Sequence, residues 1–239
     1  MTDGAPDAPG ERRAETFHLP YLLSVPVVVH RPDDADGSVV VALHGQGMSP
    51  RSFARELLPA LPPRATAVLP QAPLPFEVRK DGSFRQGNAW YVYLGDVPEF
   101  VAALERAENW LRQVVESVVA RGGLDASRVA LLGFSQGGYL AGFVGLRDPA
   151  RYARLVVAGA RLKHEVLEDA ARAAAAFPAF RVLDVHGDDD EGVAVAPCRA
   201  SAEAIAACGV PVTFRTFPFG HHVLRDADCA AAVRTFLAD

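Results

Sequence analysis

The chain has 239 residues, of which half are hydrophobic, and it carries a net charge of −5. A chain of this length can bury one large core, so we expect a single α/β domain over residues 15–239. The acidic balance and the absence of a basic stripe argue against a nucleic-acid partner. No apolar run is long enough to cross a bilayer, so integral membrane association is not expected.

The first residues and the cysteines bear on the cellular compartment. Residues 1–14 are rich in glycine, proline, alanine and charge, without an apolar core. This composition is typical of a disordered tail rather than a signal peptide. Cys198, Cys208 and Cys229 form an odd set without the spacing of a disulfide framework, so we predict free thiols in the reducing cytoplasm.

Beyond the predicted tail, short apolar runs alternate with helical patterns. This alternation predicts a mainly parallel, doubly wound sheet with helices on both faces. One or two strands are expected within 16–30, and further strands at 39–43, 66–69, 129–133, 154–158, 180–186 and 212–217. Helices are expected at 52–61, 98–121, 136–146, 163–176, 197–208 and 227–237. The stretch 70–97 is expected to be a long loop.

The pentapeptide Gly-Phe-Ser-Gln-Gly at 133–137 stands between a predicted strand and a predicted helix. Gly-x-Ser-x-Gly in this position is the nucleophile elbow of α/β-hydrolases, which exposes a serine hydroxyl above the strand ends. The sharp turn strains the backbone of Ser135, and glycine at 133 and 137 avoids a clash with it. The alternative is a glycine-rich turn with an incidental serine, because short motifs recur by accident.

A nucleophilic serine needs an acid and a base further along the chain. The apolar run 180–186 leads into three successive carboxylates, at Asp188, Asp189 and Asp190, any of which could serve as the acid. The base candidate is His221, which follows the last predicted strand, where this fold places its base. Its neighbour His222 stays open as the alternative.

Two other histidines, His44 and His186, each precede a glycine at a predicted strand end. Because neither follows the last strand, we expect them to form hydrogen bonds with backbone near the site rather than to act as the base. No His-Glu-x-x-His or Cys-x-x-Cys spacing is present, so neither a metal nor another cofactor is expected.

Taken together, these motifs resemble those of the phospholipase/carboxylesterase family of α/β-hydrolases, which includes acyl-protein thioesterases. The matching pieces are Leu-His-Gly-Gln-Gly at 43–47, Leu-Pro-Gln-Ala-Pro at 69–73, Ala-Trp-Tyr at 89–91, Gly-Phe-Ser-Gln-Gly-Gly at 133–138, His-Gly-Asp-Asp-Asp at 186–190 with Val193, and Gly-His at 220–221. The resemblance implies a Ser135, Asp190 and His221 triad. It also implies an oxyanion hole formed by the backbone N–H groups of Gln46 and Gln136.

The implied activity is hydrolysis of carboxylic esters through an acyl-enzyme on Ser135, with thioesters and lysophospholipids as further candidate substrates. In the family, the stretch 70–97 lines the acyl pocket, so Phe76, Trp90 and Tyr91 are expected to form its wall. The absence of an extra lid domain favours small to medium acyl groups. A homodimer is one alternative for the oligomeric state.

The chain also departs from the family pattern. Many members carry an aspartate where this chain has Val92, a Leu-Gly-Asp where it has Gln-Gly-Met at 46–48, and a Leu-Pro turn where it has Arg-Leu-Lys-His at 161–164. These differences leave the substrate open. Two other functions also remain. One is a protein of this fold that binds a small ligand without turning it over, and the other is a lactone or dienelactone hydrolase, which would favour cysteine at position 135.

Overall fold

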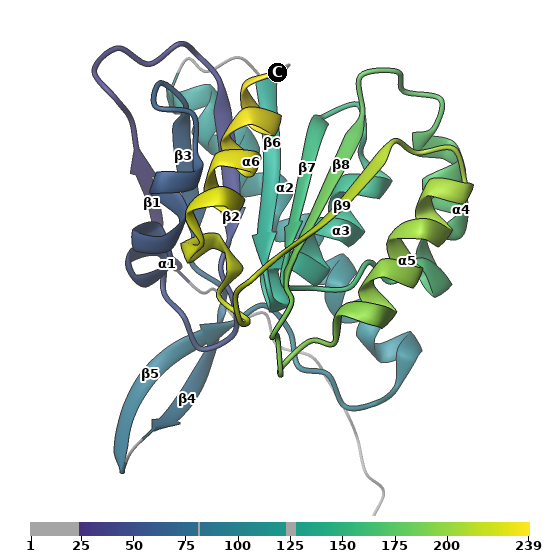
Figure 1. Cartoon of the computed structure of the whole chain (residues 1–239). Helices are drawn as coiled ribbons and strands as arrows, with labels where there is room; N and C mark the ends of the chain where they lie inside the picture. The colour runs from purple at the N-terminus through teal and green to yellow at the C-terminus, as the bar shows by residue number, and fades with distance from the viewer. Residues whose placement is uncertain (1–23, 81, 123–127) are drawn as a thin grey trace, which may run out of the picture.

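A seven-stranded sheet forms the centre of the protein in a computed structural model that describes residues 24–80, 82–122 and 128–239 (Figure 1). Its strand order is β1-β3-β2-β6-β7-β8-β9, and β1 alone runs antiparallel to its neighbour. The strands are β1 (Val27–His30), β2 (Val39–Leu43), β3 (Thr66–Pro70), β6 (Val129–Phe134), β7 (Tyr152–Ala158), β8 (Arg181–Gly187) and β9 (Val212–Phe217). The predicted tail and the first half of the 16–30 prediction lie outside the described residues.

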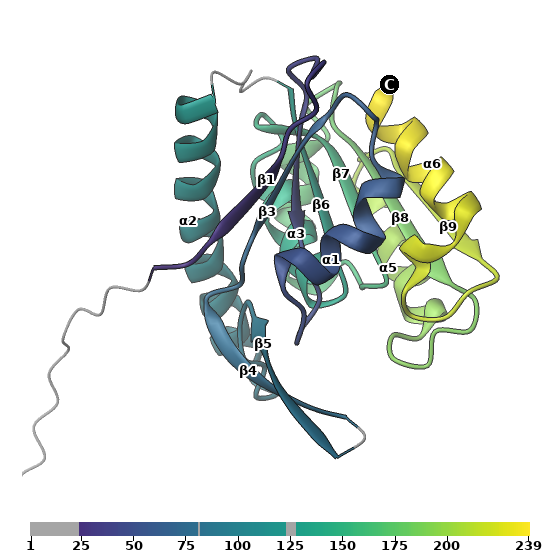
Figure 2. The same ribbon diagram turned by 90° about the vertical axis from the view of Figure 1, so that its left-hand side faces the viewer.

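Helices cover both faces of the sheet, as Figure 2 shows with α2 on one side and α1 and α6 on the other. They are α1 (Pro50–Leu57), α2 (Val97–Gly122), α3 (Gln136–Arg147), α4 (His164–Ala174), α5 (Val195–Ala207) and α6 (Ala227–Ala238), with short 3-10 turns η1 (Leu58–Ala60) and η3 (Val223–Arg225). The mainly parallel, doubly wound α/β-hydrolase architecture is therefore confirmed.

Alternation along the central strands divides the core into two layers. Val39 and Val41 on β2 join the apolar cluster under α2, α3, α4 and α5. Val40 and Ala42 point to the other face, where they join the cluster under α1 and α6. A strand buried on both faces is apolar at most positions, which is why the sequence showed nearly continuous rather than alternating runs.

The stretch 70–97 is not the long loop that the sequence predicted. It contains an antiparallel hairpin of β4 (Leu74–Lys80) and β5 (Ser83–Ala89), which projects from the body of the protein (Figures 1 and 2). The hairpin is separate from the central sheet, and apart from its own pairing it forms one antiparallel bridge, between Asn88 and Met48. The first four residues of β5 are exposed. β5 lacks apolar alternation, whereas the alternation of Leu74, Phe76 and Val78 in β4 is a strand signal that the sequence prediction missed.

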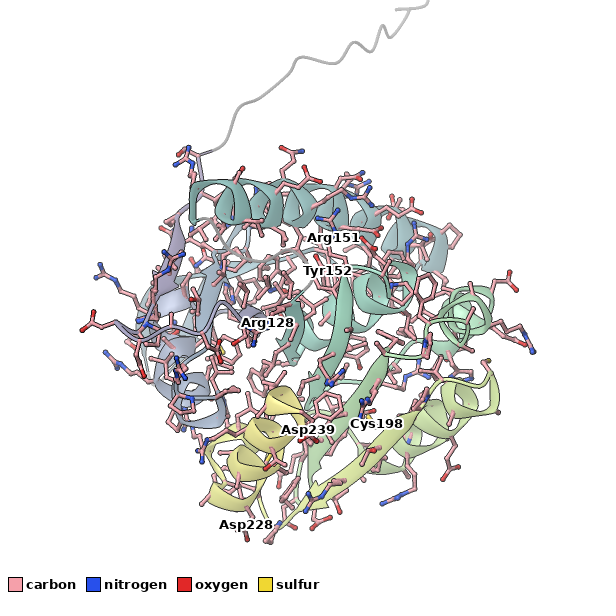
Figure 3. All side chains as sticks on the ribbon, turned by 90° about the horizontal axis from the view of Figure 1, so that it is seen from above. Arg128, Arg151, Tyr152, Cys198, Asp228 and Asp239 are labelled. Carbon is pink, nitrogen blue, oxygen red and sulfur yellow. The ribbon has the colours of Figure 1, made fainter. Side chains whose placement is uncertain are left out.

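The parallel strands begin at one edge of the sheet and end at the opposite edge, and these two edges have different roles. Figure 3 shows the edge where Arg128 precedes β6 and where Tyr152 begins β7 beside α2. The contacts here are structural: Tyr152 is buried, and Arg151 forms an ion pair with Glu116 of α2 at 3.6 Å. The opposite edge holds the carboxyl ends of β2, β6, β8 and β9, which is where ligands bind in open α/β sheets. The segments that carry the predicted site residues all begin at that edge.

Candidate active site

Ser135 occupies the sharp turn between β6 and α3 with φ 52° and ψ −120°. Within the described part of the chain it is the one non-glycine residue with a positive φ. A Cβ on Gly133 would lie 2.1 Å from the carbonyl oxygen of Gly137, and a Cβ on Gly137 would lie 2.2 Å from that of Leu43. Both glycines are therefore required by close backbone contacts, and the strained serine is held at the N-terminus of α3.

A chain of hydrogen bonds joins three of the predicted residues. The Ser135 Oγ lies 2.9 Å from His221 Nε2, and His221 Nδ1 lies 2.7 Å from Asp190 Oδ2. Because an ionised carboxylate only accepts hydrogen bonds, Nδ1 carries the imidazole proton and donates it to Asp190. Nε2 is then free to accept the hydroxyl hydrogen of Ser135. This arrangement gives a serine with a base in contact and a base with a fixed tautomer.

Asp190 is the carboxylate that the fold directs into the site. Its side chain is fully buried, and its Oδ1 accepts hydrogen bonds from the backbone N–H groups of Gly192 and Val193, each at 2.8 Å. Asp188 and Asp189 are exposed. The choice among the three aspartates that sequence reasoning left open thus has a geometric answer.

His222 turns away from Ser135. Its Nδ1 lies 2.9 Å from Glu56 Oε2, and Arg225 Nη2 donates to the other oxygen of Glu56 at 2.5 Å. Burial alone would raise the pKa of Glu56, but the hydrogen bonds from His222 and Arg225 hold it below its usual value. The bonds from His222 and Arg225 to Glu56 tie the loop after β9 to α1. Of the two neighbouring histidines, only His221 reaches Ser135.

The loop after β2, which carries Gln46, is held by the hairpin. The Gly47 N–H donates to the Asn88 carbonyl at 2.8 Å, and the Asn88 side chain donates back to the Met48 carbonyl at 3.1 Å. Arg85 adds a hydrogen bond to the Gly47 carbonyl at 2.8 Å. Asn88 and Arg85 were missed in the sequence because no motif marks them; only the hairpin brings them to this loop.

Both predicted oxyanion donors border the same cavity as Ser135. Within the described residues, the backbone N–H groups of Gln46 and Gln136 donate no hydrogen bond. The Gln136 side chain is fixed by two hydrogen bonds, since its Oε1 accepts from the Trp90 N–H at 2.8 Å and its Nε2 donates to the Tyr91 carbonyl at 3.0 Å. Two free donors beside the serine can bind a developing oxyanion.

His44 supports the loop that carries Gln46. Its Nδ1 donates to the Gly45 carbonyl at 2.8 Å, and its Nε2 accepts from the Ala72 N–H at 3.1 Å. Burial lowers the pKa of His44 to about 4, so the ring is neutral at physiological pH. Both ring nitrogens are engaged with backbone, as the sequence predicted, and none is left to act as a base.

His186 differs from that expectation. Its Nε2 lies 2.9 Å from Asp184 Oδ1, and both side chains are fully buried. Burial alone would lower the pKa of His186, but its interactions with Asp184 and Cys198 raise it to about 10. Its partner is a side chain two residues earlier on β8 rather than backbone, because alternate residues of a strand share one face.

A cavity of about 420 Å3 opens beside Ser135. Its lining residues are Gln46, Leu74, Pro75, Phe76, Ala89, Tyr91, Val92, Tyr93, Phe100, Ser135, Gln136, Tyr139 and Lys163. Phe76 and Tyr91 thus lie in the wall, as the sequence predicted. The wall is mostly apolar and aromatic with a few polar groups, which is the usual composition of a small-molecule site.

Trp90 does not line this cavity, contrary to the sequence prediction. It is 2 % exposed, and its ring lies 5.1 Å from that of His44 and 6.0 Å from that of Trp110. Its Nε1 donates to the His44 carbonyl at 2.7 Å. Consecutive side chains of an extended segment point to opposite sides, so Tyr91 borders the cavity while Trp90 packs against His44 and Trp110. Both rings also belong to the core cluster under α2.

Among residues 24–80, 82–122 and 128–239, no three or more histidine, cysteine and carboxylate side chains are grouped as a metal site. In the same part of the chain, no helix has the length and apolar character needed to span a membrane.

The geometry of this site agrees with a family comparison. Residues 25–238 match the family described as phospholipase/carboxylesterase. The chain belongs to this family. The phospholipase/carboxylesterase assignment covers every candidate site residue, from the loop after β2 to the histidine after β9.

Solved structures of similar fold include esterases and a thioesterase. Esterase PE8 is 24% identical, with 90% of this chain and 99% of that chain covered and a TM-score of 0.67. A carboxylesterase from Mesorhizobium loti is 19% identical, with 90% and 95% covered and a TM-score of 0.69. Zea mays acyl-protein thioesterase 2 is 22% identical, with 82% and 91% covered and a TM-score of 0.64. At these identities the likeness establishes the shared fold.

Proposed function

We propose that the protein is a serine hydrolase that cleaves carboxylic esters through an acyl-enzyme on Ser135. The observation that carries this proposal is the hydrogen-bond chain from Asp190 through His221 to Ser135 at a strained strand-to-helix turn. Membership of the phospholipase/carboxylesterase family supports hydrolysis of an ester bond.

In the proposed acylation step, the Ser135 Oγ attacks the ester carbonyl carbon while His221 Nε2 takes the hydroxyl proton. Asp190 stabilises the imidazolium without accepting its proton. The tetrahedral intermediate collapses, the carbon–oxygen bond to the alcohol breaks, and His221 returns the proton to the leaving alkoxide. Deacylation repeats the sequence with water as the nucleophile, which releases the acid and restores Ser135.

The negative charge on the tetrahedral intermediate needs donors that are already in place. We assign this role to the backbone N–H groups of Gln46 and Gln136, which border the cavity beside Ser135 and are unpaired within the described residues. Such a donor contributes about 3 kcal/mol to stabilisation of the transition state. The first turn of α3 adds the positive end of its dipole at the same point.

The cavity favours small to medium acyl groups, since its volume of about 420 Å3 and its largely apolar wall suit a short chain. Thioesters with such acyl groups are chemically equivalent substrates for the same attack, and lysophospholipids would need their longer chain to extend out of the cavity. The three cysteines are free, which fits the cytoplasmic location that we propose.

Covalent labelling tests this function. A fluorophosphonate should add once to the wild-type protein and not to Ser135→Ala, while Ser201→Ala should label normally because that buried serine lies on α5. The wild type and Ser201→Ala should also hydrolyse ethyl butyrate and p-nitrophenyl butyrate, and Ser135→Ala should not. Absence of both labelling and turnover in the wild type would favour the ligand-binding alternative. Turnover of lactones but not of open-chain esters would favour the lactonase.

A further inference from the structure

One charged side chain lies in the wall of the cavity beside Ser135. Lys163 borders this cavity, and no other lysine, arginine, aspartate or glutamate does so among the described residues. It stands between β7 and α4 in the Arg-Leu-Lys-His segment, which departs from the family pattern in the sequence. The Lys163 ammonium therefore contributes a positive charge to an otherwise uncharged wall.

Aromatic rings hold this ammonium at the cavity. Lys163 Nζ lies 5.6 Å from the centre of the Phe100 ring and 5.8 Å from that of Tyr93, and both rings line the cavity. The two rings are also packed edge to face at 5.2 Å. A cation attracted to the faces of aromatic rings is restricted in position, but its charge is not neutralised by them.

No carboxylate neutralises Lys163 in the described part of the chain. The nearest acidic neighbour along the helix, Glu165, forms its ion pair with Arg161 at 2.6 Å. Partial burial and the charge of Arg161 lower the pKa of Lys163, and the opposing charge of Glu165 does not cancel their effect. Without an ion pair in the described part of the chain, the charge of Lys163 is available to a ligand in the cavity.

We infer that the natural substrates carry an anionic group, in the simplest case a carboxylate, that binds Lys163 while the ester carbonyl lies at Ser135. This inference rests on the proposed function and narrows its substrate class to esters that also bear an anionic group, placed so that it lies in the same cavity as the ester carbonyl. The carboxylate can belong to the acyl part or to the alcohol part of the ester. The chemistry that recognises it is the same in both cases.

Two matched pairs of substrates test the inference and distinguish these sources. Monoethyl adipate and its neutral amide analogue, ethyl adipamate, place the charge on the acyl side. The butyrate esters of 4-hydroxybenzoate and 4-hydroxybenzamide place it on the alcohol side. For one of the pairs, the wild type should show a kcat/KM about tenfold higher for the anionic member, because a charge-assisted hydrogen bond is gained. The ratio should shrink in high salt, since the cavity is open to solvent.

Variants assign that preference to Lys163. Lys163→Met should reduce the anionic-to-neutral ratio to about twofold or below, and Lys163→Arg should keep most of it. Arg172→Met, which removes one positive charge from the exposed face of the same helix, is the matched control and should preserve the wild-type ratio. Melting temperatures of the variants establish that each is folded.

The outcomes are separable. A wild type that hydrolyses the neutral member of both pairs as fast as the anionic one overturns the inference, as does a preference that persists in Lys163→Met. In either case, hydrolysis of ethyl butyrate and labelling of Ser135 would still support the proposed function. Loss of turnover on every ester together with absent labelling would overturn the proposed function itself.

Discussion

Asn88 and Gly47 are joined by a hydrogen bond from the Gly47 N–H to the Asn88 carbonyl, and the Asn88 amide continues to the Met48 carbonyl. The exposed hairpin therefore ends in contacts that fix the loop carrying Gln46, one of the proposed oxyanion donors. The side chain at position 88 and the reaction centre are linked through backbone geometry, although Asn88 touches no part of the cavity.

The first prediction follows from that link. Asn88→Ala removes the bond to Met48 and loosens the loop, so kcat on a neutral ester should fall about tenfold with a smaller change in KM, because a misplaced oxyanion donor affects the transition state. Fluorophosphonate labelling of Ser135 should slow in parallel. Gln86→Ala, an exposed change on the same strand, is the control. Unchanged kcat in Asn88→Ala would mean that the loop keeps its geometry without this bond.

The second prediction separates the proposed acid and base from their neighbours. Asp190→Asn and His221→Ala should each lower kcat by about four orders of magnitude, as in other serine triads. Asp188→Asn and His222→Ala should retain most of the activity, although His222→Ala should lose some stability because Glu56 then lacks one partner. Steady-state rates on p-nitrophenyl butyrate measure all four variants. Retained turnover in Asp190→Asn with loss in Asp188→Asn would shift the acid to the exposed residue.

The third prediction concerns acid stability. The pKa of His44 is about 4 in the folded protein and about 6.5 in an unfolded chain, so the unfolded state binds more protons between these values. The contribution of His44 to the free energy of unfolding should therefore be complete above pH 6.5. The free energy of unfolding should fall by about 3 kcal/mol from this group as the pH drops to about 4. Denaturant unfolding of wild type and His44→Gln across pH 4 to 7.5 measures this contribution as a difference, since other titrating groups are shared. Parallel stability profiles would contradict it.

The sequence predicted the sheet, and the positions along it of Ser135, Asp190 and His221, more fully than the surroundings of the site. Strands such as β2 and β9 were found at their predicted bounds because each is a short β-rich run between clear turn signals. The fold then brings Ser135, Asp190 and His221 together, since all three follow strands whose carboxyl ends share one edge. Helix α1 begins earlier than predicted because Ser49 caps it through a reciprocal bond with Ser52.

The sequence prediction missed the hairpin and its consequences, although β4 alternates apolar Leu74, Phe76 and Val78 with other residues. The β5 segment reads Ser-Phe-Arg-Gln-Gly-Asn-Ala, which lacks the alternation of a half-buried strand. Without the hairpin, the direction of the side chains after it was unknown, so Trp90 and Tyr91 could not be assigned to opposite sides. The roles of Arg85 and Asn88 were equally inaccessible, because they depend on a contact between segments about forty residues apart.

The last prediction tests this division between wall and core. Phe76→Ala enlarges the cavity and should shift the optimum of a p-nitrophenyl ester series towards longer acyl chains, with the free energy of unfolding little changed because Phe76 is 36 % exposed. Trp90→Phe should instead lower stability and leave the chain-length optimum unchanged. It removes the bond to the His44 carbonyl and part of a buried ring, so stability should fall by about 2 kcal/mol while the chain-length profile keeps its shape. If Trp90→Phe moved the chain-length optimum and Phe76→Ala left it in place, the apolar wall of the site would have to be reassigned from Phe76 to Trp90.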